Sequence, residues 1–176
     1  MADTNTTTTL RPEIICPPPV NETAVTQLLK IPLGAHLDLF QVLDYCQCIS
    51  CALIENDDDT ERMALYGRLF AGLEVLKVVL KAPLPAHLIE RLTMDAIADD
   101  NAHRPLSTDS ETMREYCAAL TMLLLQRQQS PEQEENIGGL LFELLSVLVE
   151  DLKAPRFIRS EAGLLMISDD TNPEIH

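Results

Sequence analysis

The most informative feature of the sequence is that its two halves resemble each other. With a shift of 72 residues, the segment 67–83 aligns with the segment 139–155, and ten of the seventeen aligned positions are identical. Two leucine-rich amphipathic helices share several identities by composition alone. A matched glycine, a matched phenylalanine and a shared Lys-Ala-Pro ending are not required by amphipathicity. The sequence therefore predicts an internal duplication, in which one repeated unit buries its apolar face against the other.

The correspondence extends to the segments that precede these two. With a shift of 71 residues, Tyr45 and Cys46 align with Tyr116 and Cys117. Apolar residues recur around both pairs at spacings of three and four, which is typical of a helix that packs against another helix. The recurring residues are Leu39, Val42, Cys46, Ile49 and Leu53 in the first half, and Met113, Cys117, Leu120 and Leu124 in the second. Each repeat is therefore expected to contain a helical hairpin.

Start and stop signals indicate where the helices begin and end. The two Lys-Ala-Pro sequences end a helix, because the residue before a proline disfavours helical geometry. Three pairs fit a capping box, namely Asp58 with Glu61, Thr108 with Glu111, and Ser130 with Gln133. After a short amphipathic segment from Asn21, we expect helices over residues 36–55, 58–81, 86–98, 109–128 and 131–153, and a shorter third helix over residues 156–167.

The composition agrees with a helical chain. It includes no Trp, four Phe and three Tyr, which leaves the core to Leu, Ile, Val, Met and Ala. We therefore predict an all-α fold: a pseudo-two-fold helical bundle built from two tandem copies of a helical hairpin plus a shorter third helix. A glycine within a helix costs about 1 kcal/mol, so we expect Gly67 and Gly139 to mark a close helix crossing.

The predicted organisation is one domain preceded by an arm. The domain covers residues 21–176, and its repeats cover about 37–100 and 108–170. Residues 1–20 include the Thr6–Thr9 run and three consecutive prolines. Because such a segment buries too little apolar surface to offset the entropy of ordering, we expect a disordered, flexible arm.

The charge balance restricts the partners of the chain. It has 28 acidic and 13 basic residues, a net charge of −15. Proteins that bind nucleic acids or anionic membranes neutralise phosphates with clustered Lys and Arg, so we expect neither kind of binding. A partner protein with a basic surface fits better. The sequence shows no basic leader followed by an apolar stretch and no apolar run of about 18 residues, so we expect a cytoplasmic protein.

No group of residues predicts a catalytic, cofactor-binding or metal site. On a single helix, Cys46 points more than about 100° away from Cys48 and Cys51, so the three thiols cannot bind one metal and are expected to be buried or half-buried. The acidic groups lack the alternation of a calcium loop, and most are expected to be solvated helix-end charges. Phosphate-loop, dinucleotide and serine-hydrolase motifs are absent from the sequence. We therefore expect neither an enzyme nor a cofactor.

We interpret the protein as a non-enzymatic, acidic helical adaptor or regulatory protein that binds a partner protein, of the kind found among small bacterial or phage accessory factors. The alternative is an acidic inhibitor that occupies the nucleic-acid-binding surface of a target enzyme. Exposed apolar residues in the last element would form a surface for a partner or for a homodimer. The same residues could instead close the core of the bundle. They are Phe157, Ile158, Leu164, Leu165 and Met166.

Overall fold

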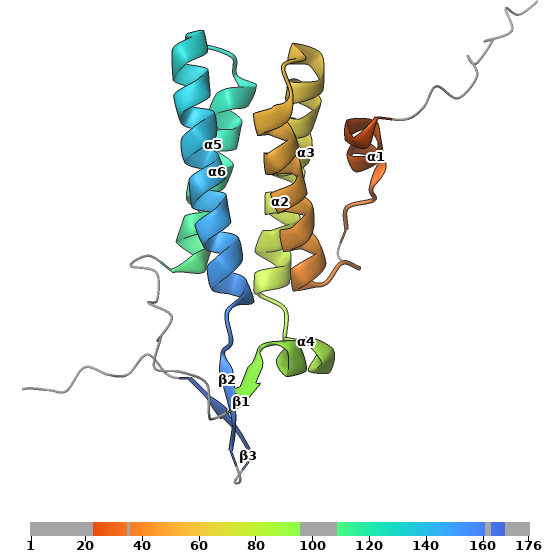
Figure 1. The fold of residues 1–176 in the computed structure, drawn as a ribbon, viewed down its shortest axis with the longest axis vertical. Helices are drawn as coiled ribbons and strands as arrows, with labels where there is room; N and C mark the ends of the chain where they lie inside the picture. The colour runs from red at the N-terminus through yellow and green to blue at the C-terminus, as the bar shows by residue number, and fades with distance from the viewer. Residues whose placement is uncertain (1–22, 35, 96–108, 161–162, 168–176) are drawn as a thin grey trace, which may run out of the picture.

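The structure, a computed structural model, describes residues 23–34, 36–95, 109–160 and 163–167. Residues 1–20, the predicted arm, lie outside this part of the chain. The described residues are mostly helical, with a small three-stranded sheet (Figure 1). The elements are α1 (Ala24–Lys30), α2 (Leu39–Glu55), α3 (Asp59–Leu80), α4 (Ala86–Arg91), β1 (Thr93–Asp95), α5 (Ser110–Leu125), α6 (Pro131–Lys153), β2 (Phe157–Ser160) and β3 (Gly163–Met166).

Helices α2, α3, α5 and α6 form an antiparallel bundle, while α1 lies outside it, against α2 and α3 (Figure 1). Helix α2 packs against α3 and α6, and α5 packs against the same two helices. All the residues of the apolar stripe predicted for α2, which begins at Leu39 and ends at Leu53, are buried. Leu73 of α3 and Leu145 of α6 are fully buried in the same core. The prediction of a mainly helical chain is confirmed.

The bundle has two different ends. At the loop end, which we define as residues 55–62 and 126–135, the turn between α2 and α3 lies beside the turn between α5 and α6 (Figure 1). At the sheet end, which we define as residues 86–95, 156–160 and 163–167, α4 and the three strands extend below the helices (Figure 1).

Two of the predicted capping residues begin the helices at the loop end. Ser130 and Gln133 form the expected capping box, in which each side chain accepts a hydrogen bond from the backbone N–H of the other residue. The Asp58 carboxylate caps α3 and accepts from the backbone N–H of Glu61 at 2.9 Å. The Glu61 carboxylate accepts from Asn56 at 2.6 Å instead of completing the box. Both caps supply acceptors for N–H groups that have no partner within the helix.

Two helices begin later than the sequence indicates. Helix α2 begins at Leu39 rather than near residue 36, because Asp38 and Gln41 form a capping box. Thr108 lies outside the described residues. The N-cap of α5 is Asp109, whose carboxylate accepts from the backbone N–H of Thr112 at 2.9 Å.

The prediction of a third helix is wrong in the second half of the chain, and the third helix predicted in the first half is too long. Helix α4 ends at Arg91, where Leu92 leads the chain into β1. Residues 157–166 contain β2 and β3 instead of a helix. Strand β1 pairs with β2 in parallel, and β2 pairs with β3 antiparallel, in the order β1-β2-β3.

Long-range pairing explains this difference. The backbone carbonyl of Leu92 accepts from the N–H groups of Arg156 and Phe157 at 2.8 and 3.1 Å. Gly163 has a φ of +121°, a conformation that side-chain-bearing residues rarely adopt and that a helix excludes. A short apolar run fits a strand or a buried helix equally well by periodicity. A strand from a distant part of the chain therefore decides the conformation of residues 157–160.

The predicted helix crossing at Gly67 and Gly139 is wrong. A Cβ atom at either position would meet no heavy atom within 4 Å, apart from its immediate surroundings in the helix. The close approach is at Gly72 of α3, where a Cβ atom would lie 2.9 Å from the Cys46 Sγ of α2. A side chain at Gly72 would displace that thiol, so glycine permits the tight packing of α2 on α3.

Candidate functional site

The five residues predicted to bind a partner come together in β2 and β3. In the antiparallel register, Phe157 lies opposite Met166, and Ile158 lies opposite Leu165. Side chains alternate between the faces of a strand. Phe157, Met166 and Leu164 therefore lie on one face of the sheet, and Ile158 and Leu165 lie on the other.

Burial divides these five residues into two groups. Phe157 and Ile158 are half-buried, and Phe157 packs against the core of the bundle. The three apolar residues of β3 are exposed: Leu164 by 53%, Leu165 by 56% and Met166 by 71%. Phe157 therefore contributes to the core and anchors the sheet to the helices. The apolar side chains of β3 do not contribute to the core, because they are exposed.

Strand β3 forms one edge of the sheet. Within the described part of the chain it pairs only with β2, so its outer edge has no strand beside it. Residues 164–167 include no charged side chain, and Ile167 is also exposed. Natural proteins commonly protect an edge strand with charged side chains, proline or a covering segment, because its backbone groups can pair with another chain. An uncharged, exposed edge strand is consequently a candidate for strand addition.

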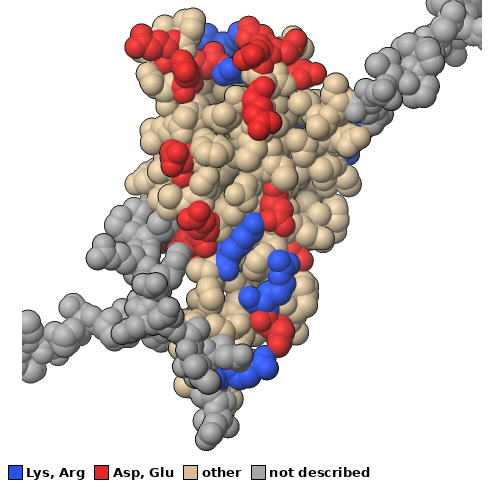
Figure 2. Space-filling view, viewed as in Figure 1, with Lys and Arg blue, Asp and Glu red and all other residues tan. Residues whose placement is uncertain are grey.

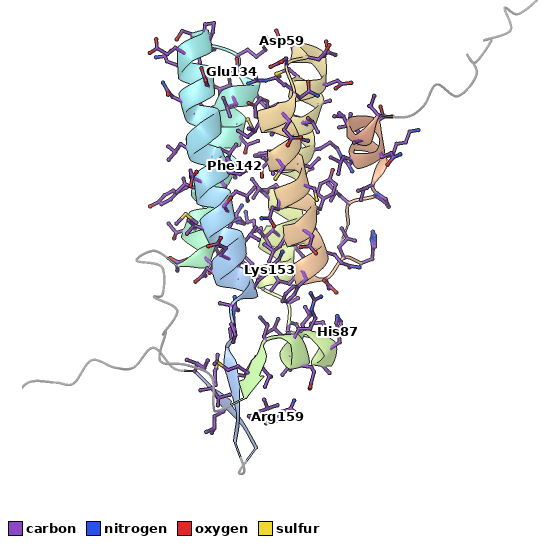
Figure 3. The ribbon with its side chains drawn as sticks, in the orientation of Figure 1. Asp59, His87, Glu134, Phe142, Lys153 and Arg159 are labelled. Carbon is purple, nitrogen blue, oxygen red and sulfur yellow. The ribbon has the colours of Figure 1, made fainter. Side chains whose placement is uncertain are left out.

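Two polar side-chain contacts involve the sheet end: one joins α4 to β2 within it, and the other joins α4 to α2 of the bundle (Figure 3 labels His87 and Arg159). Arg159 of β2 pairs with Glu90 of α4 at 2.7 Å. His87 of α4 pairs with Asp38, the N-cap of α2, at 3.1 Å between Nε2 and Oδ2. Burial opposes ionisation of the Asp38 carboxyl, but the hydrogen bonds from the Gln41 backbone and from His87 lower its pKa below the usual value. The sequence does not connect His87 to any acidic residue, and the contact with Asp38 is visible only in the fold.

The loop end has a different character. It contains eight acidic and two basic residues, whereas the described residues of the sheet end contain two acidic and three basic ones. Figure 2 shows the acidic side chains gathered at the top of the bundle, around a small basic patch. Their positions at helix starts agree with the expected helix-end charges, and the Asp58 cap is an example.

A cleft of about 580 Å³ lies between the two hairpins at the loop end. Arg62 of α3 crosses toward α6 and pairs with Glu134 at 2.8 Å, and its other contact is the hydroxyl of Tyr66 at 3.3 Å. Arg127 pairs with Asp59 across the same gap at 2.7 Å (Figure 3 labels Asp59 and Glu134). Burial raises the pKa of Tyr66, although the nearby Arg62 guanidinium acts in the opposite direction. The sequence analysis did not identify this cleft.

The cysteines of the described residues fall into two pairs. Cys46 and Cys117 are buried, and burial raises the pKa of each thiol to about 12. Cys48 and Cys51 are exposed on α2, so the prediction that they are buried or half-buried is wrong. Across the described residues, no three side chains of His, Cys, Asp or Glu converge as a metal site would require.

Within the described residues, no helix combines the length and the apolar character that crossing a bilayer requires. The chain matches no model of a protein family, no curated protein and no solved structure.

Proposed function

We propose that the protein is a non-enzymatic adaptor or regulatory protein that binds a partner protein through the exposed edge of β3. The observation that carries this proposal is the exposure of three apolar side chains on an edge strand that lacks charged residues. Burying about 100 Å² of apolar surface contributes about 2.5 kcal/mol before the costs of association, so such side chains favour a bound state.

The proposed mode of binding is strand addition. An extended segment of the partner would pair with β3, and its backbone would use the N–H and C=O groups along the outer edge. Leu164 and Met166 would contact the partner on one face of the enlarged sheet, and Leu165 would contact it on the other. The half-buried Phe157 supports the strand from the bundle side. A second copy of the chain could supply the same kind of segment, which is the homodimer alternative.

A pair of matched leucine substitutions tests this proposal. Leu165→Asp places a charge on β3, and Leu140→Asp places the same charge on α6, where Leu140 is 51% exposed. The full-length variants would be used to capture partners from native extracts, and binding of the captured protein would then be measured with purified components. We expect Leu165→Asp to abolish binding and Leu140→Asp to preserve it. Equal binding by both variants would contradict the role of β3.

Salt dependence separates the adaptor from the acidic inhibitor. Binding through apolar contacts and backbone hydrogen bonds should persist at about 1 M salt, where charges are screened beyond about 3 Å. Capture only of enzymes that act on nucleic acids, and only at low salt, would favour the inhibitor. Sedimentation of the purified chain tests the homodimer alternative. If the chain is a dimer and Leu165→Asp dissociates it, the segment that pairs with β3 comes from a second copy of the chain.

We also propose that the bundle arose by duplication of a helical hairpin. With up-down-up-down topology, a two-fold axis along the bundle would relate α2 to α5 and α3 to α6. Aligned residues near such an axis would lie opposite each other. Two observations support this arrangement: the aligned Cys46 and Cys117 are both buried in the same core, and Arg62 pairs with Glu134, which is 72 residues further along the chain. The elements after each hairpin differ, so the proposed relation concerns the helices alone.

A further inference from the structure

We propose that the cleft at the loop end binds the side chain of an arginine or lysine from a basic partner protein. This would be a second binding site, at the opposite end of the bundle from β3. It extends the proposal of an adaptor but does not require β3 to bind anything. Three properties of the cleft carry the inference: its apolar lining, its excess of carboxylates and the buried Nε of Arg62, which has no hydrogen-bond partner among the described residues.

The cleft is large enough and apolar enough for the stem of a long side chain. Its volume is about 580 Å³, and its apolar lining comes from α2 and α6: Leu53, Ile54, Leu141 and Phe142. Ile54 is 57% exposed, so part of this apolar lining faces solvent. Gly138 also lines the cleft and contributes no side chain to its wall. Lysine and arginine have aliphatic stems that pack on apolar surface while the charged group remains near water.

The carboxylates of the cleft exceed its cations. Four acidic and two basic residues line the cleft, and the two ion pairs described above neutralise one acidic residue for each arginine. Asp57 and Glu135 remain, and neither has a hydrogen-bond or ion-pair partner among the described residues. Asp57 follows α2, and Glu135 lies in the first turns of α6, so the excess carboxylates come from both sides of the gap. A cation that enters the cleft would find these acceptors unoccupied.

The position of Arg62 favours a peptide over a free amine. Its guanidinium is held by Glu134 and Tyr66, but its buried Nε has no hydrogen-bond partner among the described residues. A buried donor without an acceptor is unfavourable. Because Nε has almost no exposed surface, an acceptor reaches it only when the Arg62 side chain shifts. A residue in a peptide brings a backbone carbonyl that can accept from the shifted Nε, together with a cationic side chain for Asp57 and Glu135. A free amine would supply only the cation.

Two adjacent glycines provide a test that leaves the charge unchanged. Gly138 lines the cleft, and a Cβ atom there would lie at an ordinary contact distance of 3.7 Å from the Tyr66 hydroxyl. Gly139 does not line the cleft, and a Cβ atom there would meet nothing within 4 Å. Both lie within α6, so replacing either with leucine improves helix propensity. Gly138→Leu should fill the cleft, and Gly139→Leu is its matched control.

The probe is an acetylated, amidated pentapeptide with a central arginine between alanines, titrated into the ¹⁵N-labelled full chain and followed by amide chemical shifts. We expect saturable shifts at Gly138 and Gly139, and similar shifts with a lysine peptide. Filling the cleft with Gly138→Leu should weaken binding by about tenfold or more, whereas Gly139→Leu should leave it unchanged.

Peptides with citrulline or norleucine at the centre should bind more weakly, because both lack the charge. Free arginine amide, which lacks most of the peptide backbone, should also bind more weakly.

A charge-matched pair of variants separates the cleft from the overall acidity. Asp57→Asn with Glu135→Gln should weaken binding by about fivefold, since exposed ion pairs contribute up to about 1 kcal/mol each. Glu143→Gln with Glu150→Gln removes the same charge from exposed positions on α6 and should have little effect. Equal losses in the two double variants, or tight binding of the norleucine peptide, would overturn the proposal. So would unchanged binding by Gly138→Leu. Loss of β3 binding would not affect any of these outcomes.

Discussion

The two ends of the bundle differ in what they expose and in how they are held. At the sheet end, β3 exposes apolar side chains and has no further described strand along its outer edge, while Phe157 and Leu92 connect the sheet to the buried core. At the loop end, two ion pairs cross a cleft that carries excess negative charge (Figures 2 and 3). Among the described residues, the exposed apolar strand β3 and the acidic cleft therefore lie at opposite ends of the bundle. An adaptor with this arrangement would recognise two different chemistries at its two ends.

Apolar contacts at the sheet end should contribute far more to stability than ion pairs at the loop end. Leu92 is fully buried where α4 meets β1. Leu92→Ala should lower the free energy of unfolding by about 3 kcal/mol, because it removes buried methyl groups and leaves a cavity. Urea denaturation of the full chain measures this change. The control is Leu164→Ala, which removes an exposed side chain and should change stability by less than about 0.5 kcal/mol. Equal effects would show that β3 is buried in solution.

The ion pair across the loop end should make a smaller contribution. The side chains of Arg62 and Glu134 are 25% and 27% exposed. A double-mutant cycle with Arg62→Met and Glu134→Gln should give a coupling energy of about 1 kcal/mol, which decreases as salt is added. Urea denaturation of the two single variants and the double variant measures it. A coupling energy of zero at low salt would mean that the pair does not connect the two hairpins in solution.

The smallest predicted effect concerns two aspartates at opposite ends of the bundle. The hydrogen bond and charge of Arg127 lower the pKa of Asp59, whereas the hydrogen bonds from Thr112 lower that of Asp109. Arg127→Gln should therefore return the pKa of Asp59 toward 3.8 and leave Asp109 unchanged. NMR titration of the carboxyl groups measures both values.

The direction of the associated pH dependence follows from the lowered pKa of Asp59. Its folded-state pKa lies below its unfolded value, so its contribution to stability is fully present above the unfolded pKa. The contribution decreases as the pH falls through the folded pKa. An Asp59 pKa that does not respond to Arg127→Gln would contradict the ion pair at this end.

Local patterns were sufficient to predict the helices and several of their caps. The stripe from Leu39 to Leu53 marks the buried face of α2, because a helix places residues at spacings of three and four on one side. Ser130 and Gln133 mark the start of α6, because their reciprocal hydrogen bonds involve residues three positions apart. Both signals depend only on neighbours in the sequence.

The cleft could be predicted only in part. Its acidic residues were recognised as helix-end charges, but their assembly around Arg62 and Arg127 depends on how two distant turns lie beside each other. One signal was present, since Arg62 aligns with Glu134 when the two halves of the sequence are compared with a shift of 72 residues. Opposite charges at aligned positions form an ion pair only if the two hairpins pack around a two-fold axis. That packing depends on the whole bundle and not on neighbouring residues.

Local sequence patterns predict where the helices of the bundle run and which of their faces are apolar. They mark the last apolar segment without deciding between a surface and a part of the core. The fold is needed to see that this segment forms a hairpin that pairs with β1, that β3 is exposed while Phe157 packs on the core, and that a cleft lies between the loops. The physical reason is the range of the interactions. Helical hydrogen bonds and caps join residues a few positions apart, whereas strand pairing and ion pairs between hairpins require distant segments to meet.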